Sequence, residues 1–183
     1  MKKYIVPVLA ALVVGACAHK EAEPVAAPAT PAAPPAPTKA EAVLKSAKGS
    51  KVKGTIHFTE ENGEIKVEVM AEGMKSGPHG FHIHETGDCS AADFSSAGGH
   101  FNPASGKHGS LTSANRHAGD MGNIMADRKG KSNQSFTMKG SLSGAESIIG
   151  KAVIIHKGKD DLKSQPAGNS GAREACGVIE ALN

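Results

Sequence analysis

The sequence predicts an all-β, loop-rich domain, and three observations favour this class. Glycine is abundant, with 22 residues among 183, whereas large aromatic side chains are few, with five Phe, one Tyr and no Trp. Apolar and polar residues alternate over several short stretches, which is the period of a half-buried strand. Two long segments rich in Gly, Ser, Asn and Asp lie between some of these stretches. This pattern is more typical of a β protein with functional loops than of a helical bundle.

The N-terminus has the pattern of an export signal. Met1-Lys2-Lys3 precedes an apolar run over residues 5–14, which is shorter than the roughly 20 residues that a membrane-spanning helix needs. The run ends in Val14-Gly15-Ala16-Cys17, which resembles a bacterial lipobox. This resemblance implies cleavage before Cys17 and lipid attachment to it, and Ala18 is typical of lipoproteins of the outer membrane. The alternative is ordinary cleavage near Ala16 or Ala18, with Cys17 as a spare thiol.

A linker follows the signal. Residues 18–40 are nearly all Ala, Pro, Thr and Glu and hold six of the ten prolines, a composition that favours extended geometry and buries little. We therefore divide the chain into a signal peptide over residues 1–16, a lipidated Cys17 with a tether over 17–45, and a folded domain over 46–183. The predicted location is the periplasm, with the domain anchored to the outer membrane.

The strands of the domain are read from the alternation. Residues 52–58 alternate apolar and polar side chains, and the turn Asn62-Gly63 then predicts a hairpin with a returning strand over 64–71. A second hairpin turn is predicted at residues 127–130. Further strands are predicted at residues 79–84, 121–126, 132–139, 151–157 and 176–181.

The charge balance argues against one class of partner. Once Lys2 and Lys3 are removed with the signal, 19 basic residues stand against 18 acidic ones. This balance does not favour nucleic acid as a partner. We expect contact with a membrane only through the lipid anchor.

The stretch His79-Gly80-Phe81-His82-Ile83-His84 is central to the functional prediction. Successive side chains of a strand point to opposite faces, so Phe81 and Ile83 share a face that suits the core. His82 and His84 share the other face, where two imidazoles suit one metal ion. Taken alone, a half-exposed strand that happens to carry histidines would be an equally good interpretation.

More candidate ligands lie in or beside the two long segments, residues 85–119 and 158–175, whose length indicates functional loops. His100, His108, His117 and Asp120 offer three imidazoles and a carboxylate, a complete tetrahedral shell for a structural zinc ion. His156, at the end of an apolar strand, joins His82 and His84 as a candidate for a second metal. An all-imidazole site suits copper, which changes its oxidation state.

Five motifs together resemble those of copper-zinc superoxide dismutase, in order and over the chain from about Ser50 to its end. They are His79-Gly80-Phe81-His82-Ile83-His84-Glu85, Gly99-His100-Phe101-Asn102-Pro103, Lys107-His108-Gly109, His117-Ala118-Gly119-Asp120-Met121-Gly122-Asn123 and Ala172-Arg173-Glu174-Ala175-Cys176-Gly177-Val178-Ile179. Asp88-Cys89-Ser90 and Lys163-Ser164-Gln165-Pro166 resemble the bacterial periplasmic branch in particular.

This resemblance implies a fold and a set of site residues. The fold would be an eight-stranded antiparallel Greek-key barrel or sandwich with two long functional loops. By the motifs, one copper ion per subunit would be held by His82, His84, His100 and His156, and one zinc ion by His100, His108, His117 and Asp120. His100 would thus bridge both ions.

The resemblance also implies roles for residues around the metals. Asp160 falls where the family has a carboxylate that links a copper histidine to a zinc histidine, although the adjacent Asp161 could be confused with it. Arg173 would sit beside copper and bind the anionic substrate, and His100 would take up and return a proton. The implied reaction converts superoxide to dioxygen and hydrogen peroxide by alternate reduction and reoxidation of copper. It would protect the cell envelope.

The cysteines agree with this interpretation. With Cys17 assigned to the lipobox, Cys89 and Cys176 remain, and we expect an exported protein to pair them as a disulfide. In the family this bond ties the metal loop to the barrel.

Other interpretations stay open. A copper- or zinc-binding protein of the same fold without turnover would be expected to lack a ligand or the arginine. A structural lipoprotein of the envelope would not explain the histidines. Because the mature chain lacks Trp and Tyr, which are frequent at stable interfaces, we expect a monomer or a weak homodimer.

Overall fold

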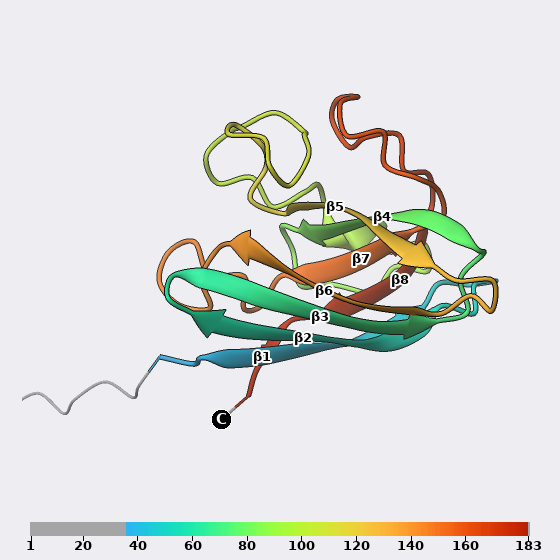
Figure 1. The fold of residues 1–183 in the computed structure, drawn as a ribbon, viewed down its shortest axis with the longest axis horizontal. Helices are drawn as coiled ribbons and strands as arrows, with labels where there is room; N and C mark the ends of the chain where they lie inside the picture. The colour runs from blue at the N-terminus through green and yellow to red at the C-terminus, as the bar shows by residue number, and fades with distance from the viewer. Residues whose placement is uncertain (1–35, 183) are drawn as a thin grey trace, which may run out of the picture. The chain divides into compact units, whose positions relative to one another are not determined.

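The computed structural model describes residues 36–182, which form one antiparallel sheet that curls into a nearly closed barrel (Figure 1). The sheet has nine strands: eight follow the order β5-β4-β7-β8-β1-β2-β3-β6, and the short β9 pairs with β1 off this path. The strands are β1 Lys39–Ser46, β2 Lys53–Glu61, β3 Glu64–Glu72, β4 Gly77–His84, β5 Asp120–Ala126, β6 Ser132–Lys139, β7 Ala152–His156, β8 Arg173–Val178 and β9 Glu180–Ala181. The predicted fold class is confirmed.

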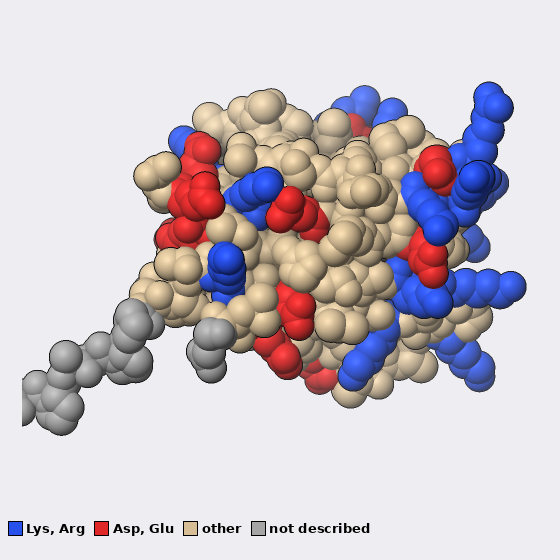
Figure 2. All heavy atoms as spheres, turned by 60° about the horizontal axis from the view of Figure 1, so that its bottom comes forward, with Lys and Arg blue, Asp and Glu red and all other residues tan. Residues whose placement is uncertain are grey.

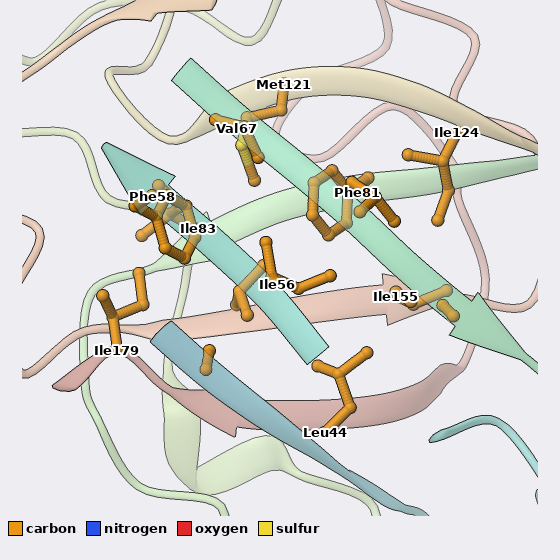
Figure 3. Packing of buried hydrophobic residues seen from close by; sticks show 14 of the residues in the cluster. Leu44, Ile56, Phe58, Val67, Phe81, Ile83, Met121, Ile124, Ile155 and Ile179 are labelled. Carbon is orange, nitrogen blue, oxygen red and sulfur yellow. The ribbon is translucent and has the colours of Figure 1, made fainter. Parts of the chain in front are cut away.

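The core lies between the two layers of the flattened barrel. One layer holds β1, β2, β3 and β6, and the other holds β4, β5, β7 and β8. Phe81 and Ile83 of β4 lie close to Ile56 and Phe58 of β2, and all four side chains are fully buried (Figure 3). This shared core fixes the position of β4.

The predicted domain boundary at residue 46 is wrong, because all of β1 except Ser46 lies within the stretch assigned to the tether. Ala40, Ala42 and Leu44 are buried, while Val43 between them is exposed, so the segment does alternate. It pairs with β2 from Lys39 opposite Thr59 to Leu44 opposite Gly54. The small size of the two alanines made this alternation hard to distinguish from the Ala- and Pro-rich sequence before it. The signal and most of the tether lie outside the described residues.

The end of the chain also differs from the prediction of one strand over residues 176–181. The structure has β8, which ends at Val178, followed by β9, and between them the buried Ile179 bonds through its backbone to Gly150 and Lys151. Strand β8 begins at Arg173, so the second long loop ends at residue 172 rather than 175.

Both predicted hairpin turns are present. Asn62 and Gly63 have φ angles of 54° and 79°, as a two-residue hairpin turn requires. In the other turn the Gly130 N–H donates to the Asp127 carbonyl oxygen over 3.0 Å, and Gly130 has a φ of 74°.

The two long loops meet beside β4. Residues 85–119 connect β4 to β5 and contain a short 3-10 helix, η1 Ser95–Ala97, and residues 157–172 connect β7 to β8. Since β4 and β7 are antiparallel, the two loops start at opposite ends of this strand pair, and both rise from the same side of the barrel (Figure 1). Among residues 36–182, no helix is long and apolar enough to cross a membrane.

Candidate metal centre

Strand β4 is buried on both faces from His79 to His84, so the half-exposed strand that the sequence left open is not what forms. Phe81 and Ile83 point into the core, whereas His82 and His84 lie on the outer face and are covered by the two loops, with exposed fractions of 0% and 1%. A strand that only happened to carry histidines would leave them in solvent. The loops therefore build an enclosed polar site on the outside of the barrel.

Four histidines form a first group on this face. His82 and His84 come from β4, His156 ends β7, and His100 lies in the loop between β4 and β5. One ring nitrogen of each lies within 4.8 Å of the others. The ladder is irregular between Gly80 and His82 and again between Ile155 and His156, and such bulges redirect side chains next to functional sites. The structure thus brings together all four residues predicted for copper.

In each ring of this group, one nitrogen makes a hydrogen bond and the other makes none within the described chain. His84 Nδ1 donates to the Gly98 carbonyl oxygen over 3.0 Å, and His156 Nδ1 donates to that of Gly171 over 3.1 Å. Their Nε2 atoms are buried and make no hydrogen bond within the described chain, and the same holds for His82 Nδ1 and His100 Nε2. Buried lone pairs without a partner are costly. Four of them, in a group whose candidate ligand atoms lie within 4.8 Å of one another, fit a cation.

The protonation of these rings also suits a metal. Burial lowers the pKa of His82 to about 4, that of His156 to about 3 and that of His84 to about 2. The positive charge of Arg173 contributes to the lower pKa of His84 and His156. All three rings are therefore neutral at pH 7, which is the state that ligates a metal.

A second group surrounds the carboxylate of Asp120, at the start of β5. Its Oδ1 atom lies 2.8 Å from His100 Nδ1, 2.9 Å from His108 Nδ1 and 3.2 Å from His117 Nδ1. Its Oδ2 atom accepts hydrogen bonds from the backbone N–H groups of Gly109 and His117. Burial alone raises the pKa of Asp120, but its hydrogen bonds outweigh burial and hold that pKa at about 2.

This second group also fits a cation. His117 Nδ1 is buried and has no hydrogen-bond partner in the described chain. Three imidazoles and one carboxylate make a closed tetrahedral set, and these are the four residues predicted for zinc.

His100 and Asp160 connect the two groups. The ring of His100 presents Nε2 to the first group and Nδ1 to the second. Asp160 accepts from His82 Nε2 over 2.7 Å and from His108 Nε2 over 2.9 Å. The structure thereby distinguishes Asp160, which is fully buried, from Asp161, which caps loop backbone groups instead. Burial raises the pKa of Asp160, but these hydrogen bonds outweigh it, so the pKa lies below its ordinary range.

Arg173 lies beside the first group. Its guanidinium donates to the carbonyl oxygen of Phe94 and, over 2.6 Å, to that of Gly98, which also accepts from His84. The loop between β4 and β5 therefore fixes both the arginine and a histidine of the site. Half-buried at the start of β8, Arg173 adds a positive charge next to the first group.

The predicted disulfide is present. Cys89 in the first loop is bonded to Cys176 in β8, with Cα atoms 5.8 Å apart and a sequence separation of 87. It fastens the loop that carries His100 to the strand that carries Arg173. By the chain-entropy account, closing a loop of this length stabilises the fold by about 4–5 kcal/mol.

Sequence reasoning missed several residues that position the site. Asn123 bonds through its side-chain amide to both the N–H and the carbonyl of Asp160. Arg116 donates to the carbonyls of Leu111, His117 and Ala118 and so shapes the first loop. Asn123 lies in one of the motifs, and so does Gln165, whose amide bonds to the His108 backbone, but no spacing rule indicated what either amide binds.

The fold and the site together define a class of protein. A family model described as copper/zinc superoxide dismutase matches residues 52–179, and this chain belongs to that family. Among solved structures, the crystal structure of the clock protein EA4 is similar, with 38% sequence identity and a TM-score of 0.76. The match covers 82% of this chain and 99% of that one.

Proposed function

We propose that this protein is an active copper-zinc superoxide dismutase of the cell envelope. One observation carries the proposal: five buried ring nitrogens make no hydrogen bond within residues 36–182, and they divide between two groups that share His100. A protein that had lost turnover would be expected to have lost a ligand or the arginine beside the first group. The described chain keeps all of them.

The two groups differ in chemistry, and this suggests which metal each takes. The second group, with three imidazoles and a carboxylate, suits a structural zinc ion, because it leaves no position for substrate. The first group offers imidazole only and suits copper. Copper bound there would supply one-electron chemistry, accepting an electron from one superoxide and giving it to the next.

The protein's own residues serve the substrate and its protons. The Arg173 guanidinium, held against the Gly98 carbonyl, attracts the superoxide anion and orients it beside the four histidines. His100 Nε2 takes up a proton in one half of the cycle and releases it in the other. Asp160 holds His82 and His108 in fixed orientation through both of its oxygens.

Metal loading tests the proposal. The metal-free chain is loaded with zinc alone or with copper and zinc together, and the removal of superoxide is measured in each case. We expect removal only when copper is present, at about one copper per chain. A chain that binds both metals without removing superoxide would instead be a metal-binding protein.

The location is a second part of the proposal and rests on the sequence of residues 1–17, which lie outside the described chain. We propose that the chain is exported and that Cys17 carries the lipid. Mass spectrometry of the protein from membranes should find an acylated N-terminal cysteine. An unmodified thiol would contradict the anchor but not the enzyme.

A further inference from the structure

The second histidine group depends on contacts from a loop that supplies none of its ligands. The loop 85–119 carries His100, His108 and His117, and Asp120 follows it directly. The loop 157–172 contributes no ligand to this group, yet two of its side chains bond to His108. One is Asp160, described above. The other is Gln165.

The Gln165 amide pairs with both backbone groups of His108. Its Oε1 atom accepts from the His108 N–H over 2.8 Å, and its Nε2 atom donates to the His108 carbonyl oxygen over 3.0 Å. The orientation of the amide follows from this complementarity, because the reverse placement would face donor to donor and acceptor to acceptor. These two hydrogen bonds resemble those of a paired residue in a β-sheet, and they connect the loop 85–119 to the loop 157–172.

These contacts determine where the ligating nitrogen of His108 lies. The ring is held at Nε2 by Asp160 and the backbone is held by Gln165, which leaves Nδ1 directed at Asp120 Oδ1, 2.9 Å away. The next residue, Gly109, donates its N–H to the other oxygen of Asp120. A shift of the His108 backbone would therefore displace two of the contacts that build the second group.

We infer that Gln165 is a positioning residue for the second metal. It holds His108 in its ligating position and makes the affinity for zinc depend on the loop 157–172, which also borders the first group. This inference rests on the proposed zinc assignment for that group. Residues that orient metal ligands typically change affinity about 10- to 100-fold when they are replaced.

The test compares two glutamines in the full-length, oxidised chain. Gln165→Met has a similar volume and loses both bonds to His108. Gln134→Met is the matched control, since the Gln134 amide bonds to Met125 and Ser132 in the barrel wall and to nothing in either group. Zinc affinity is measured by competition with a chelator, and copper affinity is measured in the same way.

We expect zinc affinity to fall about 10- to 100-fold for Gln165→Met and to change less than about twofold for the control. Copper affinity should change little in either variant. Equal zinc affinities for wild type and Gln165→Met would overturn the inference, as would an equal loss in the control.

A second measurement separates this inference from the proposed function. Amide hydrogen exchange of His108 is followed in the metal-free chain, because Gln165 Oε1 accepts the hydrogen bond of that N–H. Loss of protection in Gln165→Met, but not in the control, supports the contact whichever metal binds. If the wild-type chain took up no zinc, the proposed function would fail while this exchange result still stood. Unchanged protection in Gln165→Met would overturn the inference by itself.

Discussion

At the scale of single residues, the buried histidines make the stability of the fold depend on pH. A histidine whose folded-state pKa lies below its ordinary value of 6.5 stays neutral while the unfolded chain takes up a proton. Its contribution to stability is therefore complete above pH 6.5 and is lost as the pH falls towards the folded-state value.

We expect the metal-free chain to lose stability below pH 6.5. Between pH 6.5 and 5, each histidine that stays neutral, such as His84 or His156, lowers the free energy of unfolding by about 2 kcal/mol. Denaturant titrations at several pH values measure the slope, and His156→Gln should reduce it by about one proton. A free energy of unfolding that stays flat between pH 7 and 5 would mean that these rings are not held neutral.

A substitution at Gly168 tests the hydrogen bond between Asp160 and His108. This glycine has a φ of 66°, and a methyl group there would overlap Asp160 Oδ1 and contact His108 Nε2. Gly144 is the matched control, with a φ of 75° and nothing within 4 Å of such a methyl group. Both Gly→Ala variants should lose about 1–2 kcal/mol of stability from the backbone conformation.

Only Gly168→Ala should also weaken zinc binding, since it alone displaces the carboxylate that orients His108. Chelator competition on both variants measures this difference. Equal zinc affinity in the two variants would show that the Asp160–His108 contact does not hold the ligand.

At the scale of elements, the sequence predicted strands wherever large apolar residues alternate. Ile56 with Phe58 and Phe81 with Ile83 indicated both their strands and their buried faces. Strand β1 was missed because Ala40 and Ala42 are small and follow a Pro-rich stretch. The metal groups were predicted because histidines at motif positions are distinctive. The contacts of Asn123 and Gln165 were not predicted, because their amides bind backbone atoms and no sequence pattern indicates such contacts.

The corrected boundary leads to a prediction about truncation. A chain that begins at residue 46 lacks β1, which pairs with β2, β8 and β9 and buries Leu44. We expect it to be destabilised by several kcal/mol or to fail to fold, whereas a chain that begins at residue 36 should unfold as the longer chain does. Thermal unfolding followed by circular dichroism compares them. Equal midpoints would restore the boundary at residue 46.

At the scale of the whole described domain, charge is unevenly distributed. Lysines and arginines gather at one end of the domain (Figure 2). Lys53 and Lys131 both pair with Glu72, near the ends of β2, β3 and β6. Other exposed lysines, Lys157, Lys159 and Lys163, lie in the loop after His156. Because the net charge is small, attraction of an anion depends on which local cluster faces the site.

We predict that the loop lysines steer the substrate. Replacing Lys157, Lys159 and Lys163 by Gln should flatten the dependence of the superoxide rate on salt, since the Debye length falls from about 30 Å at 0.01 M to about 10 Å at 0.1 M. The control replaces Lys53, Lys129 and Lys131 by Gln, which changes the net charge by the same amount. An equal effect of the two triple variants would show that only the net charge matters.

The central claim is that the four-histidine group is the redox site of an enzyme, and His156 tests it most directly. His156 belongs to the first group and not to the second, so His156→Gln should lower copper content and superoxide removal together while zinc stays at about one per chain. His57→Gln, which replaces a half-buried histidine beside Glu41 and outside both groups, should leave metals and rate unchanged. The measurement is the rate of superoxide removal with copper and zinc determined in the same samples. We predict a loss of at least about a hundredfold in rate for His156→Gln; full activity in that variant with copper absent would contradict the account.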